Sequence, residues 1–272
     1  MPDYKNANNN GKTVTMKKIV TISLTTAVLC GSAMTVLAAG GDTKLKHIPW
    51  TFNGIFGTFD RQAIQRGYQV YTEVCAGCHS LKRVAFRNLA EVGFSEAEIK
   101  AIAKEASVVD GPNDDGEMFE RPGIPSDRFV PPFPNEKAAR ASNGGAFPPD
   151  LSLITKARVK GPDYLYSLLT GYEDAPESFS LPEGKYYNSA FPGYAISMAP
   201  PLSTDAVEYQ DGTPASLDQM SQDLVHFLQW SAEPEMEKRK QMGLKVMIFM
   251  LIVTGLFAIA KKRTWAKLKE SK

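Results

Sequence analysis

Two cysteines and a histidine stand together in this chain, in the run CAGCH at residues 75–79. The spacing Cys-x-x-Cys-His is the attachment signature of a c-type haem, in which two thiols add to the vinyl groups and the next imidazole binds the iron. The alternatives are a redox Cys-x-x-Cys pair or half of a zinc site. Zinc needs a second pair of ligands, and the remaining cysteine, Cys30, falls in a segment that we expect to be removed. The motif therefore predicts one covalently bound haem c, held by Cys75, Cys78 and His79.

The other axial position of the iron has several candidate ligands. Met118 lies in a flexible acidic stretch, whereas Met198 is followed by Ala-Pro-Pro, which stiffens its loop. His226 projects away from the apolar stripe of its predicted helix and is expected to be solvated, and His47 is a weaker rival. The residue types alone leave Met198, these rivals and an open iron as alternatives.

The elements that must position these groups are mainly helical. Asp60 can cap a helix whose apolar residues keep helical spacing as far as Cys75. A capping box at Ser95 predicts a helix to about residue 106, and further helices are predicted for 162–170 and 216–230. Residues 47–59 are aromatic and glycine-rich, and we expect irregular chain laid over an apolar surface. Residues 110–150 are rich in Pro and Gly and predict a long loop with clustered carboxylates.

The charge is distributed unevenly along the chain. Residues 40–240 contain 20 Lys and Arg and 28 Asp and Glu, which gives a net charge of −8. Residues 261–272 contain six Lys and Arg and one Glu, which gives a net charge of +5. An acidic body excludes nucleic acid as a partner, because nucleic acid requires a basic face, and it suits a basic protein partner.

Two apolar segments predict the membrane topology. The charged start at residues 16–18, the apolar run 19–29 and the small residues at 36–38 are typical of a secretory signal, so residues 1–39 are predicted to be an extension and a cleaved signal peptide. The alternative is an uncleaved anchor. Residues 242–260 carry one charge, Lys245, and span about 28 Å as a helix, enough to cross a bilayer. The basic tail 261–272 then lies in the cytoplasm and domain 40–240 outside it.

Several runs of residues resemble one family closely. They are RGYQVY at 66–71 before CAGCH, PPDLS at 148–152, YLYSLLTGY at 164–172, FPG at 191–193, MAPP at 198–201, DGTPA at 211–215 and AEPE at 232–235. Together they resemble the cytochrome c1 family, and the resemblance covers nearly everything from residue 46 onward. The haem motif occurs in many cytochromes, whereas the MAPP motif and the C-terminal block are much more specific.

The resemblance implies a cytochrome-c-like helical haem domain with long Pro/Gly-rich loops and one C-terminal transmembrane helix. It implies that Met198 is the sixth ligand and that Arg158 and Tyr164 contact the haem propionates, whose charge a guanidinium can neutralise. Asn143 matches another position of the haem pocket. Some bacterial relatives carry an extra disulfide in the loops before the methionine. This chain has no cysteine left for it, so these loops must be held otherwise.

The resemblance also implies a function. The chain would be the electron-transfer subunit of a quinol–cytochrome c reductase, the bc1 complex, without substrate chemistry of its own. It would take an electron from the Rieske iron–sulfur protein and pass it to a soluble basic cytochrome c, beside cytochrome b in a dimeric complex of the bacterial inner membrane. The alternatives are a haem subunit of another respiratory complex, or an open-site haem enzyme or sensor, which would require Met198 not to bind.

Overall fold

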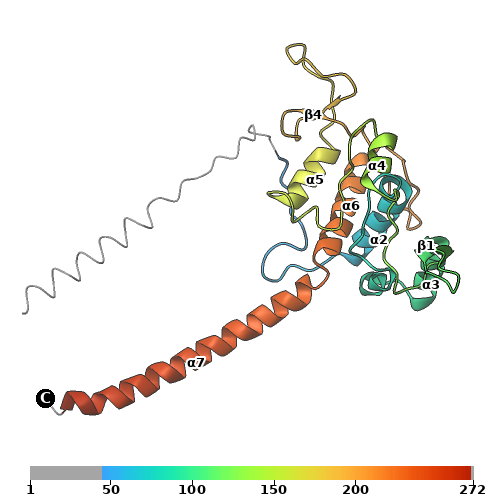
Figure 1. Cartoon of the computed structure of the whole chain (residues 1–272). Helices are drawn as coiled ribbons and strands as arrows, with labels where there is room; N and C mark the ends of the chain where they lie inside the picture. Colours follow the sequence, from blue (N-terminus) through green and yellow to red (C-terminus); the bar gives the residue numbers. More distant parts are fainter. Residues whose placement is uncertain (1–44, 271–272) are drawn as a thin grey trace, which may run out of the picture. The chain divides into compact units, whose positions relative to one another are not determined.

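The structure is a computed structural model that describes residues 45–270, so the predicted leader, its cleavage site and Cys30 lie outside the described residues. In this range the chain is mainly helical, as predicted, with two small antiparallel sheets (Figure 1). The elements in chain order are α2 (Arg61–Val70), η1 (Tyr71–Cys75), η2 (Phe86–Val92), α3 (Glu96–Glu105), β1 (Ser107–Asp110), β2 (Phe119–Pro122), α4 (Glu136–Ser142), α5 (Gly161–Leu169), β3 (Tyr186–Tyr187), β4 (Ala195–Ile196), α6 (Leu217–Ala232) and α7 (Met236–Glu270).

The core lies where α2 packs against α6, in the right half of Figure 1. Ile64 and Val70 on α2 and Phe227 on α6 are fully buried there. Gly67 lies at the crossing of the two helices. A Cβ at this position would be 2.0 Å from the carbonyl oxygen of Asp223 and 2.8 Å from the Cβ of Phe227, so only glycine allows the two backbones to approach this closely.

Arg66 and Asp223 join the same two helices by a buried ion pair. Arg66 Nε and Nη2 donate to the two carboxylate oxygens of Asp223 at 2.9 and 3.0 Å, and Gln219 Nε2 donates to the same carboxylate at 3.0 Å. The side chain of Asp223 is 1% exposed, so its charge depends on these donors. The bidentate geometry fixes the rotation of α2 against α6 as well as the separation.

The irregular segment that precedes α2 covers an apolar surface, as predicted. Trp50 and Phe52 are buried and stack with ring centroids 5.4 Å apart. Asp163, in the first turn of α5, anchors the segment by accepting hydrogen bonds from Trp50 Nε1 at 2.7 Å and from His47 Nδ1 at 2.9 Å. The tip of the segment stays outside the core, because Phe56 is 81% exposed.

The prediction that His226 is solvated is wrong. Its side chain is buried on α6, with ring centroids 5.5 Å from Trp50 and 5.2 Å from Phe52. Burial lowers the pKa of His226, an effect that Asp60 and Asp223 partly oppose. The helical period assigns this side of α6 to solvent, but the segment before α2 folds back over it.

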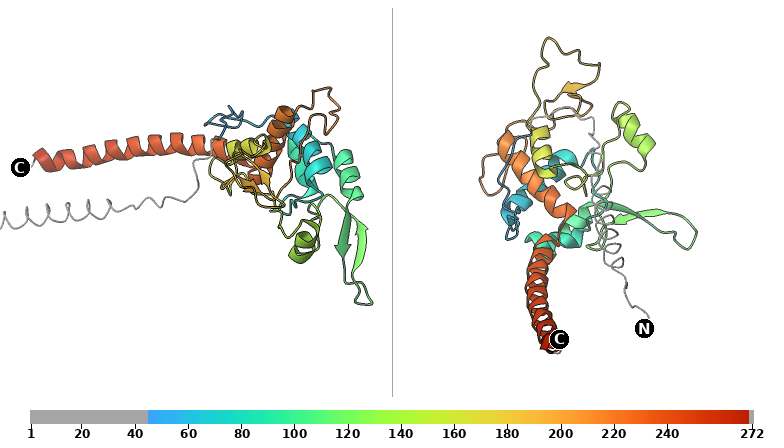
Figure 2. Two further views of the ribbon diagram at one scale, coloured as in Figure 1. Left: turned by 90° about the horizontal axis from the view of Figure 1, so that it is seen from above. Right: turned by 90° about the vertical axis from the view of Figure 1, so that its left-hand side faces the viewer.

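The prediction of one long loop over residues 110–150 is also wrong. β1 and β2 form an antiparallel hairpin, in which Ser107 pairs with Pro122 and Asp110 with Phe119, and α4 follows with Asn135 as its N-cap. The hairpin projects from the body of the domain (Figure 2). None of its strand residues is buried, five being exposed and three half-buried, so no buried face marks the strands in the sequence.

The long helix α7 contains the predicted membrane span 242–260. Residues Met236–Ala266 form a helix long and apolar enough to cross a membrane, and none of its most apolar window is buried by the rest of the structure. The start of α7 is bonded to the domain that precedes it. Arg61 Nη2 donates to Glu237 Oε2 at 2.8 Å, and Lys240 Nζ donates to the carbonyl oxygens of Phe52 and Gly57 at 2.6 and 3.0 Å.

Candidate haem site

The two cysteines lie where the first helix of the domain ends. Asp60 accepts a hydrogen bond from Ala63 N at 3.0 Å and starts α2, and the last turn, η1, widens into a π-helix that finishes at Cys75. Such a π-turn is often found at functional sites, because the extra residue per turn re-aims the following side chains. Both thiols are free; Cys75 is buried and Cys78 is exposed. Burial raises the pKa of Cys75 to about 12, so this sulfur carries its proton near neutral pH.

One hydrogen bond orients His79. Its Nδ1 lies 2.9 Å from the carbonyl oxygen of Pro149. A carbonyl only accepts, so Nδ1 carries the proton and the Nε2 lone pair is available to a metal. Tyr71 donates its hydroxyl to the backbone oxygen of His79 at 3.0 Å and ties the histidine to η1. Burial lowers the pKa of His79, which favours the neutral imidazole that binds metals.

The segment PPDLS at 148–152 holds this histidine in place. Leu151 N donates to Ser80 O at 2.9 Å, and Asp150 accepts hydrogen bonds from Ser80 Oγ at 2.8 Å and from Lys82 N at 3.0 Å. Burial alone would raise the pKa of Asp150, but these hydrogen bonds hold it below its usual value. The carboxylate therefore stays ionised and joins the residues that follow His79 to residues 148–152.

Met198 lies in the loop that follows β4 and is half-buried. Tyr172 donates its hydroxyl to the Met198 carbonyl oxygen at 3.1 Å. Burial raises the pKa of Tyr172, so the hydroxyl remains a donor across the physiological range. Sequence reasoning did not assign a role to Tyr172 or to the Pro149 carbonyl. Their roles depend on contacts between segments far apart in the sequence, and no local sequence pattern predicts such contacts.

The loop between Tyr172 and Met198 is held without a disulfide by an aromatic cluster. Tyr187 and Tyr194 stack with centroids 5.8 Å apart, and Phe179 meets Tyr187 edge-on at 5.1 Å. Asn188 is fully buried behind them and donates to Leu168 O at 2.8 Å, which joins the loop to the end of α5. Stacked rings and a satisfied buried amide restrict the loop in the way the absent cross-link would.

The structure brings Arg158 and Tyr164 together. Burial raises the pKa of Tyr164, and the nearby Arg158 guanidinium opposes that rise. Arg158 is exposed, and its Nη1 donates to Ala157 O at 3.1 Å. Asn143 does not join them among the described contacts. Its amide donates to Ala139 O at 2.7 Å, within the end of α4.

A cavity of mixed polarity lies beside Cys78. Its apolar lining residues are Pro131, Pro132, Phe133, Ala139, Phe147 and Pro148, and its polar lining residues are Ser80, Lys82, Asn135 and Glu136. Two free thiols, an imidazole with Nε2 available, a thioether on a restrained loop and the proline and phenylalanine side chains of this cavity fit a c-type haem. A zinc site does not fit, because residues 45–270 contain no group of three or more His, Cys, Asp or Glu side chains that could hold a metal ion.

Comparison with known proteins identifies the family of the chain. The model of the family described as the cytochrome C1 family matches residues 50–268. The chain belongs to the cytochrome c1 family. Among curated cytochromes c1, it is 48% identical to that of Rhodospirillum rubrum, with 84% of this chain and 90% of that protein covered. It is 53% identical to the mitochondrial cytochrome c1 1 haem protein of Arabidopsis thaliana, over 82% of this chain and 73% of that protein.

A third relative is longer than this chain. The protein named cytochrome b/c1 of Bradyrhizobium diazoefficiens is 50% identical over 88% of this chain, which spans only 38% of that protein's length. Cytochrome c1 is a haem subunit of the respiratory bc1 complex, an oxidoreductase in which it transfers electrons and works with cytochrome b and the Rieske protein. The membrane-spanning helix α7 agrees with that membership.

Proposed function

We propose that this chain attaches one haem c through Cys75 and Cys78 and holds it with His79 and Met198 as axial ligands. The bound haem supplies reversible one-electron chemistry between ferric and ferrous iron. The protein contributes position, because the thiols and the imidazole are delivered by the rigid end of α2 and η1. Arg158 and Tyr164 are proposed to face the propionates, and Asn143 to line the pocket from the end of α4.

The observation that carries this proposal is the hydrogen bond between His79 Nδ1 and the Pro149 carbonyl. It selects the tautomer that leaves Nε2 free and fixes the plane of the ring, as outer-shell partners of metal-binding histidines commonly do. Tyr172 holds the backbone of Met198, which would be the other ligand of the iron. A neutral thioether favours the reduced iron, so His/Met ligation implies a fairly high reduction potential.

The electron is proposed to arrive from the Rieske iron–sulfur protein and to leave to a soluble cytochrome c. Membership of the cytochrome c1 family supports this route. The relative named cytochrome b/c1 supports cytochrome b as a permanent neighbour, since its name joins the two. The basic residues after α7's apolar stretch support a cytoplasmic C-terminus, with the haem domain on the other side of the membrane.

The docking face for the soluble cytochrome is proposed to be the acidic loop that leads to Met198. Glu173, Asp174, Glu177 and Glu183 are exposed on it, and none of them has an ion-pair partner in the described part of the chain. Exposed like charges close to the proposed ligand loop steer a basic protein toward the haem edge, and salt screens this attraction.

The test of ligation is an optical spectrum and redox titration of the purified holoprotein beside Met198→Leu, with Met118→Leu as control. Met118 is 61% exposed on the hairpin, so its loss is expected to change neither spectrum nor potential. Met198→Leu is expected to remove the methionine–iron band and to lower the potential. A high-spin wild-type protein that binds carbon monoxide readily would show an open iron and refute the proposal.

The test of docking is the rate of electron transfer to a basic cytochrome c as ionic strength rises. We expect the wild-type rate to fall with salt. Glu173→Gln with Asp174→Asn is expected to lower the low-salt rate more than Asp114→Asn with Asp115→Asn, which changes the net charge equally on the distant hairpin. A flat salt response, or equal effects of the two pairs, would contradict the proposed face.

A further inference from the structure

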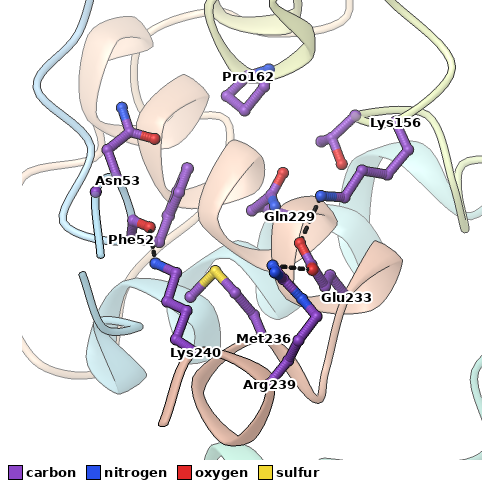
Figure 3. A pocket seen from close by; sticks show the side chains of 11 residues that line it. Phe52, Asn53, Lys156, Pro162, Gln229, Glu233, Met236, Arg239 and Lys240 are labelled. Carbon is purple, nitrogen blue, oxygen red and sulfur yellow. Dashed lines mark hydrogen bonds and ion pairs between the residues drawn. The ribbon is translucent and has the colours of Figure 1, made fainter. Parts of the chain in front are cut away.

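A second cavity lies where the haem domain meets the start of the membrane helix, and we call it the anchor cavity. It is formed by residues 52–54, the turn at 155–162, the end of α6 and the first turn of α7, and its volume is about 270 Å³ (Figure 3). This is just below the range of about 300–1,000 Å³ typical of sites that enclose a whole small ligand. The size suits the headgroup of a larger molecule whose remainder lies outside.

The lining of the anchor cavity is positively charged. Lys156 and Arg239 both pair with Glu233, so two cations share one carboxylate. Lys240 contributes a third cation, and its hydrogen bonds go to two neutral backbone carbonyls. Figure 3 shows the ends of Lys156 and Arg239 converging on Glu233. The cavity therefore retains uncompensated positive charge, which an anion can neutralise.

Further polar groups line the same cavity. Thr155 is 4% exposed, and its Oγ1 is buried without a hydrogen-bond partner within residues 45–270. Gln229 is 5% exposed and also lines the cavity. A hydroxyl and an amide can donate to anionic oxygens beside the basic side chains.

The position of the anchor cavity indicates the source of the anion. Arg239 and Lys240 lie three and two residues before the apolar stretch that begins at Met242, and the side chains of this stretch are largely exposed for contact with lipid. The end of a membrane-spanning segment lies at the level of the lipid headgroups. Basic side chains at this depth can pair with the phosphate of an anionic lipid by charge-assisted hydrogen bonds.

We propose that the anchor cavity binds the phosphate headgroup of an anionic phospholipid, with Lys156, Arg239 and Lys240 around the phosphate and the acyl chains along α7. The bound lipid would connect the haem domain to the bilayer at the hinge between α6 and α7. It would also account for a cluster of cations at an end of α7 where the adjoining domain is acidic overall.

The test is native mass spectrometry of the delipidated full-length holoprotein in detergent, titrated with phosphatidylglycerol, phosphatidylcholine or inorganic phosphate. Lys156→Gln with Arg239→Gln is expected to weaken phosphatidylglycerol binding by about 25-fold, at about fivefold for each basic residue. Arg239→Gln alone leaves Glu233 paired with Lys156, which protects the fold, and is expected to weaken binding about fivefold.

The matched control is Lys100→Gln with Lys238→Gln. It removes the same charge and two ion pairs, to Glu96 and Glu235, from exposed positions outside the cavity, and is expected to change binding by less than about twofold. Equal binding by control and cavity variants would overturn the proposal. So would inorganic phosphate that binds as tightly as the lipid and displaces it. A carbodiimide cross-link in native membranes from Lys156 to a carboxylate of another subunit would also overturn it, by assigning the cavity to a protein interface.

Discussion

The substitution Gly67→Ala tests the crossing of α2 and α6. Intrinsic helix propensity alone predicts that alanine stabilises the middle of α2 by about 1 kcal/mol. The new Cβ would lie 2.0 Å from the Asp223 carbonyl oxygen, whereas an ordinary contact begins at 3.4 Å, so the helices must separate by about 1.4 Å. This separation also stretches the bonds between Arg66 and Asp223 beyond hydrogen-bonding range.

The expected loss of stability is the sum of three contributions. Overpacking costs about 1–3 kcal/mol, and stretching a charged hydrogen bond costs about 1.5–3 kcal/mol. After the gain of about 1 kcal/mol from helix propensity, the free energy of unfolding is expected to fall by about 1.5–5 kcal/mol. For a domain of this size, the melting temperature then falls by about 3–20 °C.

The assay is thermal unfolding of the full-length holoprotein in detergent, followed by near-ultraviolet circular dichroism and by the Soret band. Gly243→Ala is the matched control, because this glycine is also helical and nothing lies within 4 Å of a Cβ added there. An unchanged or higher melting temperature for Gly67→Ala would refute the reasoning and show that propensity outweighs the close approach.

Three further results are expected. The lowered pKa of His226 means that the unfolded chain binds the proton more tightly than the folded chain, so the free energy of unfolding should fall as the pH drops below about 6.5. The substitution His226→Leu should therefore bring the melting temperatures at pH 7.5 and pH 5.5 closer together, and an unaltered pH dependence would contradict this. Asp163→Ala should release Trp50 and its segment from α5, cost about 1–3 kcal/mol and speed limited proteolysis before residue 60, whereas unchanged cleavage would count against this anchor. The substitution Tyr172→Phe removes one hydrogen bond to the Met198 backbone, worth about 1 kcal/mol, and should weaken the methionine–iron band and lower the reduction potential. A change in stability alone would mean that Tyr172 does not position the ligand.

Most of the predicted helices have a local N-cap, as α2, α3 and α6 do, whereas α5 was predicted although no side chain caps it. Asp60 and Ser95 cap α2 and α3 by accepting backbone hydrogen bonds three residues later, as expected. The span within α7 was predictable because length and apolar composition decide it. α4 and the β1–β2 hairpin were missed, because they expose most of their surface and carry no apolar period.

The burial of His226 shows what a single helix cannot reveal. Its neighbours on α6 mark its side of the helix as polar, yet Trp50 and Phe52, more than 170 residues earlier in the chain, cover it. This contact depends on how the irregular segment before α2 folds back, and Asp163 on α5 holds that segment by accepting a hydrogen bond from Trp50.

By itself the sequence determined the chemistry that is available. The spacing of Cys75, Cys78 and His79 is local, so any fold that keeps a helix up to residue 75 presents the three groups together. The membrane helix was determined in the same way, by a continuous apolar run.

Tertiary structure decided how these groups are held. The proton on His79 is set by the Pro149 carbonyl, 70 residues away, and the Met198 loop is restrained by Tyr172, 26 residues away. The separation of α2 and α6 is set by a glycine and a buried ion pair. Hydrogen bonds and close packing act through space over a few ångströms, so the sequence contains their partners but the fold alone brings them into contact.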